Sequence, residues 1–267
     1  MPHEESWFSL LPFHERFQEW ARVFGKPFNE DGLTWYAHAQ PGVQHIYAAL
    51  LVLGIIVVVS VITDTSIRDA QGDLVPPAKL TVRNFVELLV GTCLRMMSDI
   101  MGEKAARHFL PLIGTCAFFI LFGNALGLVP GFLPPTSNFN TTLACGLVVF
   151  VVTHVYGIKV NGWNHIKHFF GPKIGIAWLP LMLLMFVIEM ISHIARPLSL
   201  GIRLMANMTA DHLVLTIFVG LVPFITPIPL PMYLLGTLVV VVQTLVFCLL
   251  ATVYIGMAIE EADHADH

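Results

Sequence analysis

The sequence predicts an all-α, polytopic membrane protein, and three observations lead to this fold class. Hydrophobic residues make up 56% of the 267 residues. Charged residues make up only 12%, whereas soluble domains carry about 25%. Residues 109–158 and 213–259 contain no Asp, Glu, Lys or Arg. Such stretches are long enough for membrane-spanning helices, each of which needs about 20 apolar residues.

The first two thirds of the chain divide into a tail, three spans and one amphipathic segment. Residues 1–44 are polar and aromatic, which predicts an extramembrane tail with a short amphipathic helix near residues 10–24. The spans are expected at about 45–62, 109–129 and 141–158. Between the first two, residues 82–102 alternate polar and apolar side chains at helical spacing. This pattern is typical of an interfacial helix or a half-buried hairpin arm.

The last third predicts a long tilted helical hairpin at about 174–258. As one helix, residues 174–221 would extend about 70 Å, against a hydrocarbon core of about 30 Å. They must therefore form two helices or one strongly tilted helix, and Pro197 could kink it. An uncharged loop at 222–232 leads into the last helix, at about 233–258. Residues 259–267 form an acidic tail, so the integral membrane domain is expected at 45–258.

Charge and cysteine patterns orient the chain and exclude some functions. The basic stretches 63–108 and 159–173 alternate with the chargeless loops 130–140 and 222–232, which puts the C-terminus in the cytoplasm and the N-terminus outside. The net charge of −4 argues against a nucleic-acid partner. Four scattered cysteines without a CxxC spacing argue against disulfides and cysteine metal sites, and we expect no metal and no cofactor.

Ionisable residues inside the apolar segments gather almost entirely within 189–212. An arginine at the centre of a membrane helix costs roughly 3 kcal/mol, so such a residue marks an ion or proton pathway by default. Helical spacing places five of these residues and one amide on one polar stripe: Glu189, His193, Arg196, Arg203, Asp211 and the amide Asn207. Ser192 and Ser199 lie just off its edge, and His212 points elsewhere. A lone buried amide in the last helix, Gln243, needs a partner, for which Arg203 is a candidate.

These residues also carry a resemblance. The run RPLSLGIRLMANM, followed by an apolar helix with a single Gln, resembles subunit a of the F-type ATP synthase. The runs FGNALGLVPG, PTSNFNTTLA and IGMAIEEAD are similar to that family as well. The resemblance implies that Arg203 faces the carboxylate of each rotor-ring subunit. It also implies matching roles for Asn207, Gln243, Glu189 and Arg196.

The resemblance implies a function, partners and a location. The chain would be the proton-translocating stator subunit, an essential channel subunit that is not an enzyme on its own. Its partners would be the rotor ring of c subunits, the peripheral-stalk b subunits and membrane lipid, in the inner membrane of a bacterium. Protons would pass Asp211, His212, Asn207 and Gln243 on the outer side. They would pass Glu189, His193 and Ser199 on the inner side.

The sequence departs from the family pattern at several positions. Many bacterial members have glutamate where this chain has His212 and histidine where it has Gly236. Asn138 stands where an acid is common, and Gly127 replaces an aspartate. We infer that the outer half-channel uses a rearranged set of acids and histidines, in which Asp211 adds an acid beside His212.

Other interpretations of the same residues remain open. Arg203 could pair with Asp211 or Glu189 to hold helices together, and Glu189 could serve only as the partner of Arg196 or His193. His154 is expected to be an interhelical hydrogen bonder. At the level of function, the alternatives are a secondary ion transporter, although no internal repeat is visible, and a structural membrane assembly subunit.

Overall fold

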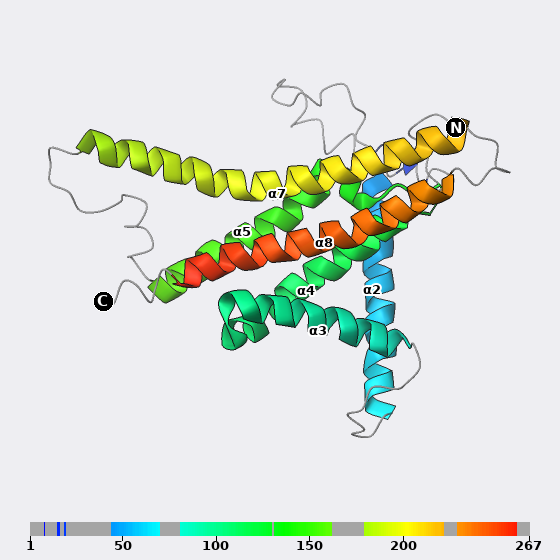
Figure 1. Cartoon of the computed structure of the whole chain (residues 1–267), viewed down its shortest axis with the longest axis horizontal. Coiled ribbons are helices and arrows are strands. Elements are labelled where there is room, and N and C mark those ends of the chain that lie inside the picture. The colour runs from blue at the N-terminus through cyan, green and yellow to red at the C-terminus, as the bar shows by residue number, and fades with distance from the viewer. Residues whose placement is uncertain are drawn as a thin grey trace.

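Six α-helices and one 3₁₀ turn make up the described part of the computed structural model. The structure describes residues 44–69, 81–129, 131–161, 179–221 and 229–260, together with residues 8, 15, 16 and 19. The elements are α2 (Gln44–Asp69), α3 (Val82–Met101), α4 (Glu103–Leu126), η2 (Pro135–Ser137), α5 (Phe139–Asn161), α7 (Leu179–Leu221) and α8 (Pro229–Glu260). In Figure 1, α7 and α8 run side by side and lie crosswise to α2.

The predicted fold class is confirmed. Among the described residues, five helices are long and apolar enough to cross a membrane, namely α2, α4, α5, α7 and α8. Helix α3 is not among them, in agreement with its amphipathic pattern. Helices α2, α5 and α8 extend beyond the expected spans at both ends. Helix α4 begins earlier and ends earlier than expected, and α7 begins five residues later. The amphipathic helix expected near residues 10–24 lies almost entirely outside the described residues.

A tight hairpin joins α3 to α4. Gly102 connects them with a positive φ of 78°, a backbone conformation that glycine adopts without a steric cost. At the other end of α3, the Thr81 hydroxyl accepts a hydrogen bond from the backbone N–H of Asn84 and caps the helix. The hairpin packs on α8 through a buried cluster that includes Met97, Ile113 and Ile255.

Helix α7 resolves the question of the 174–221 segment in favour of a single long helix. It has 43 residues and is therefore about 64 Å long, with Pro197 inside it. Helix α5 approaches it very closely, since a Cβ atom added at Gly146 would lie 2.9 Å from the carbonyl oxygen of Pro197. On the other helix, a Cβ added at Gly201 would lie 3.2 Å from the Cα of Leu143. Glycine at both contacts lets the two backbones meet, as is common between membrane helices.

The packing face of α7 fixes where its polar side chains lie. Leu200, Leu204 and Met208 are buried at helical spacing and pack against a cluster that includes Ile120 and Phe247. The polar stripe runs beside this apolar line, at the edge of the contact with α8. The core of the bundle therefore holds the stripe in a fixed rotational position.

Candidate functional site: the polar stripe of α7

Arg203 lies near the middle of α7, and its side chain is exposed. Within the described part of the chain, it makes no hydrogen bond or ion pair. In particular, it pairs with neither Asp211 nor Glu189, so the alternative of a structural ion pair inside the chain is not supported. The guanidinium is thus presented on the outer surface of the helix hairpin.

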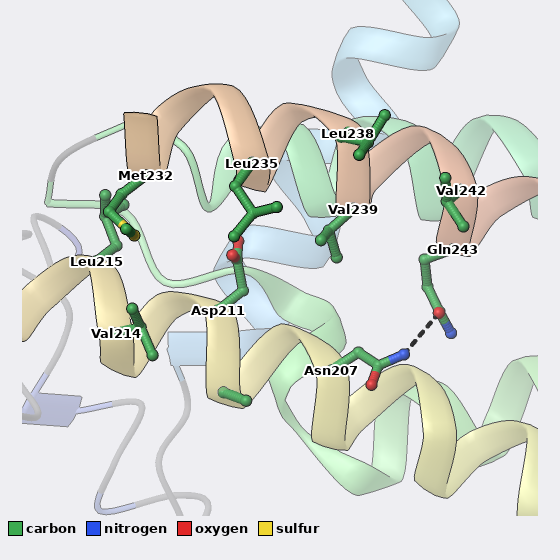
Figure 2. A pocket seen from close by; sticks show the side chains of 11 residues that line it. Asn207, Asp211, Val214, Leu215, Met232, Leu235, Leu238, Val239, Val242 and Gln243 are labelled. Atoms are coloured by element: carbon green, nitrogen blue, oxygen red, sulfur yellow. Dashed lines mark hydrogen bonds between the residues drawn. The ribbon is translucent and has the colours of Figure 1, made fainter. Parts of the chain in front are cut away.

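The buried amide of Gln243 has a different partner from the one proposed for it. The Asn207 side-chain amide donates a hydrogen bond to Oε1 of Gln243 over 2.8 Å, across the contact between α7 and α8 (Figure 2). The expectation that Arg203 would pair with Gln243 is therefore wrong. The reason is helical geometry: Asn207 lies one turn further along the same stripe, and its shorter side chain reaches α8 directly.

An open cavity of about 440 Å³ lies between α7 and α8 beside this hydrogen bond. We call it the carboxamide cavity. Its wall is mostly apolar, with three polar side chains, Asn207, Asp211 and Gln243 (Figure 2). The lining residues are Asn207, Ala210, Asp211, Val214, Leu215, Met232, Leu235, Leu238, Val239, Val242 and Gln243. Since water occupies about 30 Å³ per molecule in the liquid, the cavity has room for about ten or more waters.

Gly236 makes space for the Asp211 carboxylate. A Cβ atom at this position would lie 3.0 Å from Oδ2 of Asp211 and 2.8 Å from Cδ2 of Leu128. Asp211 on α7 therefore occupies the space that a side chain on α8 would otherwise fill. The acid at position 211 and the glycine at position 236 therefore depend on each other sterically.

His212 belongs to a different surface of α7. It does not line the carboxamide cavity but lies against the backbone of Gly127, at the end of α4. This agrees with the expectation that it points away from the stripe. Nearby, Asn138 contacts Nδ1 of His45 at 3.4 Å, and the Thr209 hydroxyl donates to the Ser137 carbonyl over 3.4 Å.

A second group of polar side chains lies on the other side of Arg203 along α7. We call it the imidazole cluster: Glu189, His193, Arg196, His154 from α5 and Tyr254 from α8. Nδ1 of His193 lies 3.4 Å from Oε1 of Glu189, so the partner of Glu189 is His193 rather than Arg196. The ring centroids of His154 and His193 are 5.3 Å apart. The Arg196 guanidinium lies 5.6 Å from the centroid of the Tyr254 ring.

The imidazole cluster leaves little space between its side chains. His154, His193, Arg196 and Tyr254 border a partly open cavity of about 20 Å³, which is room for about one water molecule. Ser199, at the edge of the stripe, is exposed, and its hydroxyl donates to the Arg196 carbonyl over 2.9 Å. The sequence pattern did not single out Tyr254, and no spacing rule could have found it, because it reaches the cluster from a helix more than 50 positions away.

The imidazole cluster and the carboxamide cavity lie far apart along α7, at a separation comparable to the thickness of the hydrocarbon core of a membrane. From Glu189 to Asp211, α7 rises about 33 Å, close to the thickness of a hydrocarbon core. Arg203 stands between them. The arrangement can exchange protons at both ends of one helix and holds a permanent positive charge in between, since arginine does not lose its proton in proteins.

Comparison with known proteins places the chain in a family. Residues 46–256 match the family model described as ATP synthase A chain. Curated relatives named ATP synthase subunit a include one from Sorangium cellulosum, 44% identical, with 92% of each chain covered. Another, from Geobacter sulfurreducens, is 44% identical over 84% of this chain and 91% of the relative. A third, from Trichlorobacter lovleyi, is 52% identical over 68% of this chain and 75% of the relative.

Proposed function

The chain belongs to the ATP synthase A chain family and is a proton-channel stator subunit of an ATP synthase, and we propose that its two half-channels meet a rotor ring at Arg203. One observation carries this proposal above the others. Arg203 is exposed on α7 and has no ion-pair partner among the described residues. A membrane-embedded cation without a partner in the described part of its own chain calls for an anion from a neighbouring chain.

The proposed partner of Arg203 is the carboxylate carried by each c subunit of the rotor ring. A fixed positive charge favours the ionised form of a nearby carboxylate, and a carboxylate must be neutral before it can face lipid. Arg203 therefore holds the rotor carboxylate in its charged state and keeps the two half-channels from connecting directly. The b subunits of the peripheral stalk would hold the chain still while the ring turns.

The outer half-channel is assigned to the carboxamide cavity. Its size and the three polar side chains in its wall support a water-filled path that passes Asp211, Asn207 and Gln243. His212 would serve this half-channel from the α4 side, beside the backbone of Gly127. A proton that arrives here neutralises a rotor carboxylate.

The inner half-channel is assigned to the other end of the stripe. There the returning rotor carboxyl group releases its proton past Ser199, Arg196, His193 and Glu189. The driving force is about 2.3 kcal/mol per charge for each 100 mV, with the pH difference added. The chain alone would catalyse no reaction, because ATP would be made by other subunits of the complex.

The charge distribution supports the placement of the chain. The chain is a multi-pass membrane protein, and we propose that it lies in the inner membrane of a bacterium, with its N-terminus outside and its C-terminus in the cytoplasm. Residues 45–258 would form the channel domain, and residues 1–44 and 259–267 would be extramembrane tails.

The decisive experiment replaces Arg203 in the assembled complex. Arg203→Ala should lower ATP synthesis roughly 100-fold or more, in line with the loss of one preorganised charge at a reacting group, and should alter passive proton flux through the membrane sector. Arg203→Lys keeps the charge but not the planar guanidinium, and should also be impaired. Both rates would be measured in membrane vesicles.

The matched control is Arg95→Ala, because Arg95 is an exposed arginine on α3, away from the stripe. It should leave synthesis unchanged. Normal ATP synthesis in Arg203→Ala, with a normally assembled complex, would contradict the proposed barrier and leave the chain with a structural role in assembly.

A further inference from the structure

The other titratable groups of the imidazole cluster lie on α7 and α8, whereas His154 belongs to a third helix. It lies on α5, and its ring stands edge-to-face against that of His193, at a centroid distance of 5.3 Å. Both side chains are partly buried. The two rings border the same cavity of about 20 Å³, together with Arg196 and Tyr254. The contact is therefore part of the tight packing of α5 on α7.

The hydrogen bonds of the two rings fix the same tautomer in each. Nδ1 of His154 lies 2.9 Å from the carbonyl oxygen of Phe150, and Nδ1 of His193 lies 3.0 Å from that of Glu189. A carbonyl oxygen can only accept, so in the neutral rings Nδ1 carries the hydrogen and Nε2 carries the lone pair. Each histidine can thus take up one proton at Nε2 while Nδ1 keeps its bond to the backbone.

We propose that His154 is a proton-relay residue of the inner half-channel. Protons released by the rotor carboxyl group near Arg203 would then travel along the contact between α5 and α7. This inference rests on the proposed function and extends it to a residue outside the α7 stripe. Its basis is the juxtaposition of two imidazoles of matching tautomer around a cavity with space for about one water. The small volume favours a path in which side chains and single water molecules share the transfer of the proton.

The transfer balances without any co-reactant. A proton released by the rotor carboxyl group, through water, binds Nε2 of His193 and gives an imidazolium. That proton passes through the single water to Nε2 of His154, which leaves His193 neutral. His154 then releases it to water on the cytoplasmic side. Both rings end as they began, and the rotor carboxylate has lost one proton.

The charged and titratable groups around His154 come from α7 and α8. On α7, Glu189 lies 3.4 Å from His193, and Arg196 borders the same cavity as the two imidazoles. On α8, Tyr254 contacts Arg196 and borders that cavity as well.

The test compares His154→Gln with a matched histidine in the intact ATP synthase. Gln retains a polar side chain of similar length but cannot carry a proton. ATP-driven proton pumping and passive proton flux in vesicles, per assembled complex, should fall roughly tenfold or more, since general acid–base groups contribute on the order of 10²–10⁴ in rate and water can replace part of this. His108→Gln is the control, because His108 is exposed and bonds Tyr156 outside the cluster.

Two further measurements distinguish a relay from a packing role. Imidazole added on the cytoplasmic side should restore much of the flux in His154→Gln, since a small base can replace the lost carrier. The double variant His154→Gln/His193→Gln should be little worse than the more impaired single variant, because groups that act in series are not additive. Additive losses without rescue by imidazole would overturn the relay, as would unchanged flux in His154→Gln.

The Arg203→Ala experiment keeps the two proposals apart. If Arg203→Ala abolishes synthesis but His154→Gln is normal, the half-channel model stands and the relay through α5 is wrong. If Arg203→Ala is normal, the proposed function itself fails.

Discussion

The two ends of the α7 stripe differ in how much room they leave for water. The carboxamide cavity has a volume of about 440 Å³ and an apolar wall with two amides and one carboxylate. The imidazole cluster borders a cavity of about 20 Å³ and has two imidazoles in ring contact, one carboxylate beside His193 and one guanidinium beside Tyr254. Under the proposed function, the first end would conduct mainly through water and the second also through side chains. The two ends of one helix would then move protons by different means.

The difference arises from the helices that pack on each end. The cluster end of α7 lies against α5, where Gly146 and Gly201 bring the two backbones together and leave a cavity of only about 20 Å³. The cavity end lies against α8, where Gly236 removes a side chain and leaves Asp211 in the space. Glycines that face a backbone, Gly146 and Gly201, allow close helix packing at the cluster end. The glycine that faces a polar side chain, Gly236, leaves space for that side chain at the cavity end.

The largest effect at the cavity end is expected from Asp211→Asn. This change keeps the size of the side chain but removes its titration, and among the described residues Asp211 is the only carboxylate that lines the cavity. Proton-driven ATP synthesis should fall roughly 100-fold, at the lower end of general acid–base contributions. The control is Asp99→Asn, on the exposed face of α3, which should be unchanged. Unimpaired synthesis in Asp211→Asn would mean that water and amides alone conduct at this end.

The fold was largely predictable because its signals are local. Chargeless stretches locate the five candidate spans. The amphipathic pattern of residues 82–102 agrees with the absence of α3 from the described helices that are long and apolar enough to cross a membrane. For residues 174–221 the sequence allows either two helices or one tilted helix, since Pro197 can break or kink a helix. The structure keeps one helix, because its first turns after the proline are held by close packing of α5 and by the buried side chains Leu200 and Leu204. That packing is a tertiary effect that no local pattern contains.

The candidate site was predictable only along one helix. Helical spacing placed the stripe and turned His212 away from it, in agreement with the structure. Contacts between helices could not be derived in this way. Gln243 was assigned to Arg203 but bonds Asn207, and the ring contact of His154 with His193 required the α5–α7 packing to be known.

Filling the space at Gly236 would test whether the cavity must stay open. In Gly236→Ala, the new Cβ would lie 3.0 Å from the Asp211 carboxylate and 2.8 Å from Leu128, so both must move. We expect a loss of proton flux of roughly tenfold, in keeping with the cost of about 1–3 kcal/mol for overpacking. Gly54→Ala is the control, because nothing lies within 4 Å of a Cβ at that position. Equal flux in the two variants would show that the position of Asp211 does not matter.

A double-mutant cycle would measure how far the amide pair shapes the cavity. Asn207→Ala and Gln243→Ala each remove one side of the 2.8 Å hydrogen bond. The coupling between them should be about 1 kcal/mol, or about fivefold in proton flux, the usual net value of such a bond. The cycle of Asn207→Ala with Thr92→Ala, a distant residue on α3, should show no coupling. Zero coupling between Asn207 and Gln243 would mean that they act independently in the channel.

The smallest effect is expected at the cluster end, where Tyr254 holds Arg196. The Arg196 guanidinium lies 5.6 Å from the centroid of the Tyr254 ring. Such a contact stabilises the cation by about 0.5–2 kcal/mol, and this stabilisation comes from the ring rather than from the hydroxyl. Tyr254→Phe should therefore change proton flux less than about twofold, whereas Tyr254→Leu should lower it roughly threefold by releasing Arg196. Tyr156→Phe, which removes a hydroxyl bonded to His108 outside the cluster, is the control for loss of a hydroxyl. If Tyr254→Phe proved as damaging as Tyr254→Leu, the phenol would itself carry protons, and the cluster would conduct through three helices rather than two.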